Sequence, residues 1–357
     1  MKILFVHKNK LGDSGEAAMY YFPKALADRG YNVTMIVPAG GQSNIFGGSV
    51  SVIEIESNHN WLAAVLNVIK SEKPDVVHIF LYSGAGIVPL LARVFSSSKF
   101  VLDIRSPLLR EGLARVLHQV KNLLEPIAFD AITAHGIESS WTQVGKRKDI
   151  HFLPPGVNLS LAANSIQEKN KKSDDIFRLV YIGSLDKLRK PIKMLEAVIN
   201  AAKLCCIQLD IYGDGSERKD LEQYITKNSA TNYIHFKGVV ERELLLEKLS
   251  GYDLGLSYVP SGLYDAAPAL KTLEYLACGV PVLATNTLGN RMFIQKGFNG
   301  FLADEDSFSE QLVEIINQKN LSEIRLNTSK SIEEFDWQKI VEKRLLPVYQ
   351  NILDYAS

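Results

Sequence analysis

The chain has 357 residues, of which 46% are hydrophobic and 22% are charged, and this suits a soluble globular protein of two domains. Its 40 basic and 40 acidic residues balance to a formal net charge of zero, which argues against nucleic acid as a partner. The three cysteines show neither a disulfide pattern nor a metal-ligand spacing, and no apolar run reaches the length of a membrane span, so we expect a reducing, cytoplasmic compartment.

Strand-like and helix-like segments alternate through the first part of the chain. Helical patterns cover 15–30 and 60–72. The strand-like segments are short and rich in β-branched residues, and they lie at 2–7, 32–37, 51–55, 75–80, 99–104, 130–134 and 150–154. This alternation predicts a parallel sheet with helices on both faces.

A polar, lysine-rich stretch at 160–177 interrupts the alternation and is typical of an interdomain linker. Strand-like segments then resume at 177–183, 206–213, 233–238, 253–259, 280–285 and 300–303. We therefore predict two doubly wound α/β domains in tandem, 1–160 and 173–335, followed by a long amphipathic segment at 336–357. In such domains ligands bind at the carboxyl ends of the strands.

A loop with Gly12 and Gly15 follows the first strand and leads into a helix. Main-chain amides behind such glycines can approach a phosphate closely. An ordinary strand–helix turn capped by Ser14 is the alternative.

Gly213 and Gly215 also follow a strand and open a helix. Arg218 stands where a dinucleotide-binding fingerprint has its third glycine. A tight turn that approaches a ligand survives this change, but an NAD-dependent dehydrogenase is disfavoured.

A basic cluster follows the first strand of the second domain, in "YIGSLDKLRKP", which contains Ser184, Arg189 and Lys190. Exposed lysines in loops are usually only solvated. Two cations at the carboxyl end of a strand suit a diphosphate, because arginine offers a planar fork and lysine a mobile point charge.

The segment "PALKTLEYLACGVPVLAT" predicts a helix that begins at Pro268 and leads into a buried strand. Lys271 lies in the first turn, where the helix dipole disfavours a cation. If this helix start faces an anion, Lys271 binds that anion and Glu274 accepts from sugar hydroxyls such as a ribose diol. The alternative is a surface ion pair between Lys271 and Glu274, worth less than about 1 kcal/mol.

These segments together resemble the retaining glycosyltransferases of family 4, which have the GT-B fold. The most specific match is "ALKTLEYLACGVPVLAT", preceded by "GYDLGLSYVP" and followed by "FNGFLA". Weaker matches follow one another in the order of the family, at the loop of Gly12 and Gly15 and at "LPPGVN", "YIGSL", "YGDGSE" and "HFKGVV". The resemblance implies two Rossmann-like domains facing a cleft, with the terminal segment 336–357 crossing back to the first domain.

The resemblance also implies roles for individual residues. Glu274 would hold the ribose of the nucleotide, Arg189 or Lys190 would contact the diphosphate, and Ser184 stands where many members have arginine. The complete set expected to bind the nucleotide sugar is Ser14, Gly15, Gly183, Ser184, Gly213, Gly215, Lys271, Glu274, Ala269 and Leu270. Many members carry a second glutamate eight positions before the first, where this chain has Ala266 beside Asp265. Either Asp265 replaces it, or Lys271 and nearby amides act instead, or the donor site is impaired.

Members of this family need no metal or further cofactor. The resemblance implies the same here, with fixed cations and amides stabilising the departing diphosphate while the configuration of the sugar is retained. Asp103 and Arg105 end one strand of the first domain, and His135 ends the next. Asp103 and His135, with Arg189 and Lys190, are therefore the catalytic candidates, although capping or packing is the alternative for the first two.

We thus predict a cytoplasmic retaining glycosyltransferase that moves a sugar from a UDP- or GDP-sugar to a glycan or lipid-linked acceptor in cell-envelope polysaccharide synthesis. A non-catalytic GT-B partner subunit and a nucleotide-sugar 2-epimerase are the alternatives. The helical segment 108–124 has an apolar stripe with Arg115, His118 and Lys121 outside it. We expect a solvated surface helix there; peripheral contact with the inner face of a membrane is the alternative.

Overall fold

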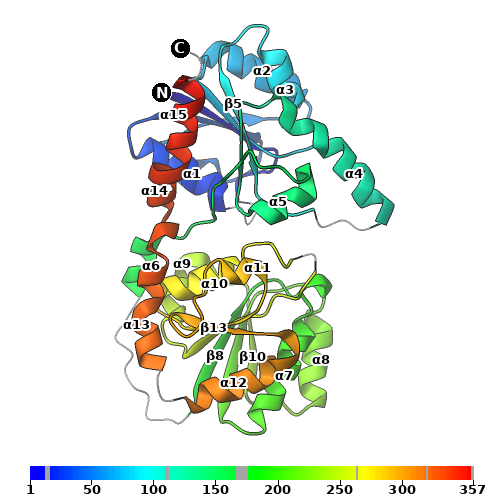
Figure 1. Ribbon diagram of the computed structural model, residues 1–357, viewed down its shortest axis with the longest axis vertical. Helices are drawn as coiled ribbons and strands as arrows, with labels where there is room; N and C mark the ends of the chain where they lie inside the picture. The colour runs from blue at the N-terminus through cyan, green and yellow to red at the C-terminus, as the bar shows by residue number, and fades with distance from the viewer. Residues whose placement is uncertain (13–16, 109–111, 166–175, 263, 319–320, 355–357) are drawn as a thin grey trace. The chain divides into compact units, whose positions relative to one another are not determined.

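Short apolar segments form the strands of two separate parallel sheets, each flanked by helices (Figure 1). The computed structural model describes residues 1–12, 17–108, 112–165, 176–262, 264–318 and 321–354. Unit 1 comprises Met1–Gly156 and Trp337–Ser357, and unit 2 comprises Val157–Asp336. The predicted architecture of two doubly wound α/β domains is confirmed.

The sheet of unit 1 has the strand order β3-β2-β1-β4-β5-β6-β7, and all neighbouring strands are parallel. All five residues of β4 are buried, as expected for a central strand covered on both faces. The strands are β1 (Lys2–Val6), β2 (Asn32–Pro38), β3 (Ser51–Ile55), β4 (Val76–Phe80), β5 (Lys99–Ile104), β6 (Ala131–Ala134) and β7 (Ile150–Phe152).

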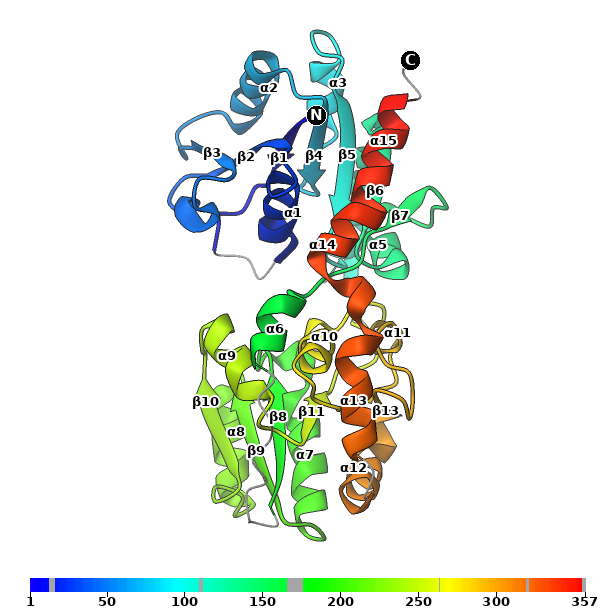
Figure 2. The same cartoon turned by 90° about the vertical axis from the view of Figure 1, so that its left-hand side faces the viewer.

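Helices from both ends of the chain cover the sheet of unit 1. Its early helices are α1 (Ala17–Ala27), η1 (Ser43–Phe46), α2 (Trp61–Glu72), α3 (Ile87–Ala92), α4 (Gly112–Leu124), η2 (Glu125–Ala128) and α5 (Ile137–Val144). The last ones, α14 (Trp337–Ile340), η6 (Val341–Leu345) and α15 (Leu346–Asp354), form one continuous rod (Figure 2). This rod shares a hydrophobic core with α1 and β1, which confirms that the terminal segment returns to the first domain.

The sheet of unit 2 has the strand order β10-β9-β8-β11-β12-β13, again parallel throughout. The order reverses between β8 and β11, and in open α/β sheets ligands bind at the carboxyl ends of the strands beside such a reversal. The strands are β8 (Phe177–Ile182), β9 (Ile207–Tyr212), β10 (Ile234–Gly238), β11 (Leu254–Ser257), β12 (Val282–Thr285) and β13 (Gly300–Ala303).

Two hydrophobic cores hold the helices of unit 2 against its sheet. One core contains apolar residues of α7 (Pro191–Ala202), α8 (Arg218–Lys227) and α12 (Phe308–Asn317). The other contains residues of α6 (Leu159–Ser165), α9 (Arg242–Leu249) and α10 (Leu270–Ala277). The remaining helices are η3 (Lys187–Arg189), α11 (Leu288–Arg291), η4 (Glu305–Ser307), α13 (Leu321–Ser331) and η5 (Glu333–Phe335).

Helix α6 departs from the predicted elements, because the sequence favours a linker from residue 160. Asn158 initiates this helix, since its Oδ1 accepts a hydrogen bond from the Leu161 amide at 3.0 Å. Ala162 is fully buried in the core that contains α9 and α10. A helix of only seven residues carries too little periodicity to be recognised in the sequence.

Candidate functional site

The start of α10 has no side-chain cap. The helix begins at Leu270, after the buried Ala269, whose side chain cannot accept from the free amides of the first turn. These amides and the helix dipole favour an anion. Ala269 and Leu270, both predicted to bind the nucleotide sugar, lie at this end of the helix.

Buried hydroxyl groups fix α10 to the sheet of unit 2. Thr272 Oγ1 lies 2.7 Å from Ser257 Oγ on β11 and 2.8 Å from Asn290 Oδ1 on α11. Tyr275 Oη accepts from the Ile182 amide, at the end of β8, at 2.7 Å. All of these hydroxyls are fully buried, so α10 is held rigidly against two strands.

Lys271 is buried at the start of α10, with only 9% of its surface exposed. Its Nζ lies 3.9 Å from the centroid of the Tyr181 ring and has no hydrogen-bond partner within the described residues. Burial lowers the pKa of the ammonium well below its usual value, the charge of Arg189 lowers it further, and Glu274 offsets part of this. A buried donor without an acceptor is costly, so an anion beside this group would stabilise it.

The alternative of a surface ion pair required Glu274 to pair with Lys271, and the structure does not show this pair. Oε1 of Glu274 instead lies 2.8 Å from Nη2 of Arg242, at the start of α9, and 16% of the Glu274 side chain is exposed. Arg242 is a partner of Glu274 that the sequence did not reveal, because no local spacing connects α9 with α10. The ion pair restrains Glu274 and leaves Oε2 for a hydroxyl donor.

The loop after β8 carries the basic cluster. The guanidinium of Arg189 lies 4.2 Å from the centroid of the Tyr264 ring, a cation–π contact that orients it. Lys190 adopts a left-handed conformation (φ 45°) just before α7, and its side chain is exposed. Ser184 donates to Asp186, and this bond, followed by one from the Ser216 amide, lowers the pKa of Asp186.

The glycines of this region serve contacts within the protein. A Cβ on Gly213 (φ +141°) would lie 1.9 Å from the carbonyl oxygen of Gly183, and one on Gly215 would lie 2.6 Å from the carbonyl carbon of Leu185. The loops after β8 and β9 therefore touch through their main chains. A Cβ on Gly183 would lie 2.9 Å from Lys271 Nζ, so this glycine makes room for the ammonium group.

Two further predicted features lie elsewhere. Ser14 and Gly15 are outside the described residues. The main-chain carbonyl of Asp265, beside Ala266, accepts a hydrogen bond from the Gly289 amide at 2.8 Å.

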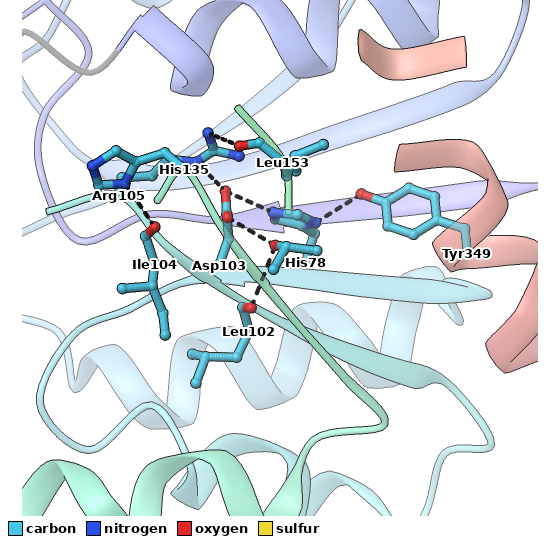
Figure 3. A network of polar contacts seen from close by, with 9 residues as sticks. His78, Leu102, Asp103, Ile104, Arg105, His135, Leu153 and Tyr349 are labelled. Atoms are coloured by element: carbon cyan, nitrogen blue, oxygen red, sulfur yellow. Dashed lines mark hydrogen bonds and ion pairs between the residues drawn. The ribbon is translucent and has the colours of Figure 1, made fainter. Parts of the chain in front are cut away.

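Unit 1 contains a buried polar network that connects the neighbouring strands β4, β5 and β6 (Figure 3). Asp103 is fully buried; its Oδ1 accepts from Thr133 Oγ1 at 2.8 Å, and its Oδ2 accepts from Arg105 Nε at 2.6 Å. His78 Nε2 lies 3.3 Å from the same Oδ2, and Tyr349 Oη of α15 lies 2.8 Å from His78 Nδ1. The C-terminal rod is thereby tied to a central strand.

Charge in this network resides on the aspartate and arginine. Burial alone would raise the pKa of Asp103, but the charge of Arg105 and the hydrogen bond with His78 outweigh it and the pKa falls below its usual value. Burial lowers the pKa of His78 despite the neighbouring carboxylate, so its ring is neutral. Asp103, predicted to be catalytic, thus lies buried with both oxygens engaged, where it positions Arg105.

Arg105 lines a small cavity of about 60 Å³ that also contacts His7, Lys8, Asn9 and Gln143. Its Nη1 donates to the Leu153 carbonyl at 2.9 Å, whereas the buried Nη2 has no partner within the described residues. His135, the other catalytic candidate of this unit, is buried, and its Nδ1 donates to the Ile104 carbonyl at 2.9 Å. Of these groups, Arg105 offers the unused donor.

Neither unit shows a metal centre in the part of the chain that the structure describes. No three histidine, cysteine, aspartate or glutamate side chains there are grouped to hold an ion. The same residues include no helix of sufficient length and hydrophobicity to span a bilayer. In unit 2, sequence spacing missed the rings of Tyr181 and Tyr264, which contact the cationic groups of Lys271 and Arg189.

Comparison with known proteins identifies relatives of both units. Residues 163–333 match the family model described as glycosyl transferases group 1, and residues 2–110 match that described as glycosyl transferase 4-like. The chain is 26% identical over 219 residues to the UDP-N-acetylglucosamine–peptide N-acetylglucosaminyltransferase GtfA subunit of Streptococcus agalactiae. This match covers 58% of the chain but only 41% of that relative, so the chain spans less than half of its length.

Two similarities extend over almost the whole chain. One is to the lipopolysaccharide core biosynthesis glycosyltransferase LpsE of Rhizobium meliloti, 22% identical with 90% of each chain covered. The other is to the crystal structure of Anabaena Alr3699/HepE in complex with UDP, with a TM-score of 0.76, 19% identity, and 100% of this chain and 99% of that chain covered. The structural likeness establishes the GT-B fold.

Proposed function

The chain belongs to the group 1 glycosyl transferases of GT-B fold, and from this premise we propose that it transfers a sugar from a nucleotide-sugar donor to an acceptor. The observation that carries the proposal is the buried, unpartnered ammonium of Lys271 at an uncapped helix start. A group of this kind gains most from a ligand that brings negative charge to it. The diphosphate of a nucleotide sugar is such a ligand.

The donor would be bound by unit 2. In the proposed complex, Lys271, Arg189 and the first amides of α10 receive the diphosphate, while Glu274 accepts from a ribose hydroxyl. Lys190, exposed beside Arg189, is a further candidate for the leaving group. The same cations would stabilise the charge that develops as the glycosidic bond breaks, so no metal is needed for this step.

We propose UDP as the first nucleotide to test, since the similar Anabaena protein was solved with UDP. GDP is the alternative. Retention of configuration and a glycan or lipid-linked acceptor of the cell envelope complete the proposal, and the name of the Rhizobium relative supports this setting. Activity measured with and without a chelator tests metal independence.

Calorimetric titration of the protein with UDP and GDP tests the donor site. We expect Glu274→Gln to weaken binding by about tenfold or more, because an amide cannot replace the charge-assisted acceptor of the ribose. Glu222→Gln is the matched control, since it breaks another Arg–Glu ion pair of unit 2, that of Arg218 and Glu222, on α8. Equal affinities of the two variants would refute the ribose role of Glu274.

Turnover separates the proposed transferase from its alternatives. Release of UDP from a donor only when an acceptor is added supports transfer. Release with epimerisation of the sugar in the absence of acceptor would identify a 2-epimerase. Tight nucleotide binding without turnover of any donor would instead identify a non-catalytic subunit.

A further inference from the structure

The connection between β11 and α10 is fixed at two points. Near its start, the Ser261 amide and Ser261 Oγ both donate to Oε1 of Glu305, at 2.8 and 2.7 Å. Near its end, the Asp265 carbonyl accepts from the Gly289 amide at 2.8 Å. Tyr264 lies between these two points in the chain, so the position of its ring depends on both of them.

Glu305, the first residue of η4, anchors this connection to the core of unit 2. Its Oε2 accepts from Tyr258 Oη at 3.0 Å. Tyr258 is buried, and its ring packs edge-on against Phe308 with 5.3 Å between the ring centroids. Burial raises the pKa of Glu305, but the hydrogen bonds from Ser261 and Tyr258 and the charge of Lys190 outweigh it, so the pKa falls below its usual value. The side chain is therefore a carboxylate with three donors directed at it.

The ring of Tyr264 connects this loop with the basic cluster after β8. The guanidinium of Arg189 lies 4.2 Å from the ring centroid, and a cation–π contact of this kind restrains the orientation of the guanidinium. Burial and then the charge of Arg189 lower the pKa of Lys271, so the two cations lie near one another. The position of the Tyr264 ring thus affects where Arg189 lies relative to Lys271.

We propose that Glu305 is a positioning residue of the donor site, which holds Ser261 and thereby keeps the Tyr264 ring where it orients Arg189. The inference rests on the proposed function, because the diphosphate is the ligand that Arg189 would contact. Glu305 itself would not touch this ligand, since a carboxylate repels phosphate and its oxygens already accept from three donors. The alternative is that Glu305 acts through its charge on Lys190, and a change that removes only the charge separates the two.

Calorimetric titration of two Glu305 variants with UDP separates hydrogen bonding from charge. Glu305→Ala removes the acceptor of all three bonds, and we expect it to weaken UDP binding about fivefold or more. Glu305→Gln keeps a carbonyl oxygen for Ser261, and we expect an affinity within about twofold of that of the unchanged chain. Glu314→Ala is the matched control, because it removes an exposed carboxylate of α12 that accepts from Gln311, and it should leave the affinity unchanged.

A double-mutant cycle tests whether Glu305 acts through the ring of Tyr264. Tyr264→Leu removes the aromatic face that Arg189 contacts, and it should itself weaken UDP binding about fivefold. In that background, Glu305→Ala should weaken binding by less than about twofold more, because no ring remains for it to position. A residue that only stabilises unit 2 would instead lower the melting temperature and give losses of affinity that add.

Circular dichroism reports whether each variant is folded, and Ser261→Ala, which removes one donor to Glu305, is a milder variant that should weaken binding in the same direction. Unchanged affinity of Glu305→Ala, additive losses in the cycle, or equal losses in Glu305→Ala and Glu305→Gln would each overturn the inference and leave the proposed function intact. Failure of the unchanged chain to bind UDP or GDP would overturn both.

Discussion

Replacing Lys271 by methionine should strengthen the ligand-free protein and weaken nucleotide binding. The ammonium is buried without an acceptor, and an unsatisfied buried donor costs about 1–3 kcal/mol. Methionine keeps the length of the chain and a favourable contact with the Tyr181 ring. Because unit 2 contains residues 157–336, each kcal/mol regained corresponds to about 2–4 °C in melting temperature.

The same change should reduce UDP affinity roughly 10- to 150-fold. A hydrogen bond between a cation and a phosphate oxygen contributes about 1.5–3 kcal/mol, and 1.4 kcal/mol is a factor of ten in Kd. The two effects therefore have opposite signs, which distinguishes a binding residue from a structural one.

Thermal unfolding and calorimetric titration with UDP measure both effects on one preparation. Lys193→Met, at an exposed lysine of α7 that pairs with Glu196, is the control and should alter neither quantity appreciably. A Lys271→Met protein that melts earlier and binds UDP with unchanged affinity would refute the reasoning, since Lys271 would then be a packing residue.

Three further outcomes follow from the buried groups. UDP affinity should decrease as pH rises, because the pKa of Lys271 is lowered in the free protein and a bound phosphate raises it again; the same affinity on both sides of neutral pH would contradict this. Tyr275→Phe should destabilise unit 2 by about 1–3 kcal/mol in urea, because it leaves the Ile182 amide without its acceptor; an unchanged midpoint would show that water replaces the hydroxyl. Unit 1 should lose stability as pH falls below 6.5, because the pKa of His78 is lower in the folded protein than in the unfolded chain; melting curves that do not change between neutral and mildly acidic pH would oppose this expectation. Tyr349→Phe should lower the stability of unit 1 at neutral pH, because it removes the donor to His78.

The sequence predicts what local periodicity and turn residues determine. The strands of both sheets and the helix at 270–277 follow from runs of β-branched residues, from Pro268 and from Gly279. The predicted start at Pro268 is two residues early, because α10 begins at Leu270 and Pro268 precedes its N-cap residue, Ala269. The two charged residues of this helix are nevertheless identified, because a strand–helix connection defines them locally.

Contacts between distant segments are not encoded in this way. Arg242 and Glu274 belong to different helices, and only the packing of α9 and α10 in one core brings them together. The exposure of Val116 and Val120 on α4 is missed for a related reason: an amphipathic pattern identifies two faces of a helix but not which of them is covered, and here the buried Asn122 donates to Gln143 of α5.

Rigidity explains why the buried lysine can be maintained. In a loosely held helix, Lys271 would turn its ammonium toward water and recover its solvation, and the free energy of that relaxation would be lost to ligand binding. Thr272 and Tyr275 prevent this, because their hydroxyls tie the adjacent turns of α10 to β11 and β8. Gly183 supplies the space beside the ammonium, where any larger residue would displace it. The cost of the unpartnered charge is therefore retained in the folded protein until an anion reaches it, and this is the physical basis on which unit 2 would prefer a diphosphate to a neutral sugar.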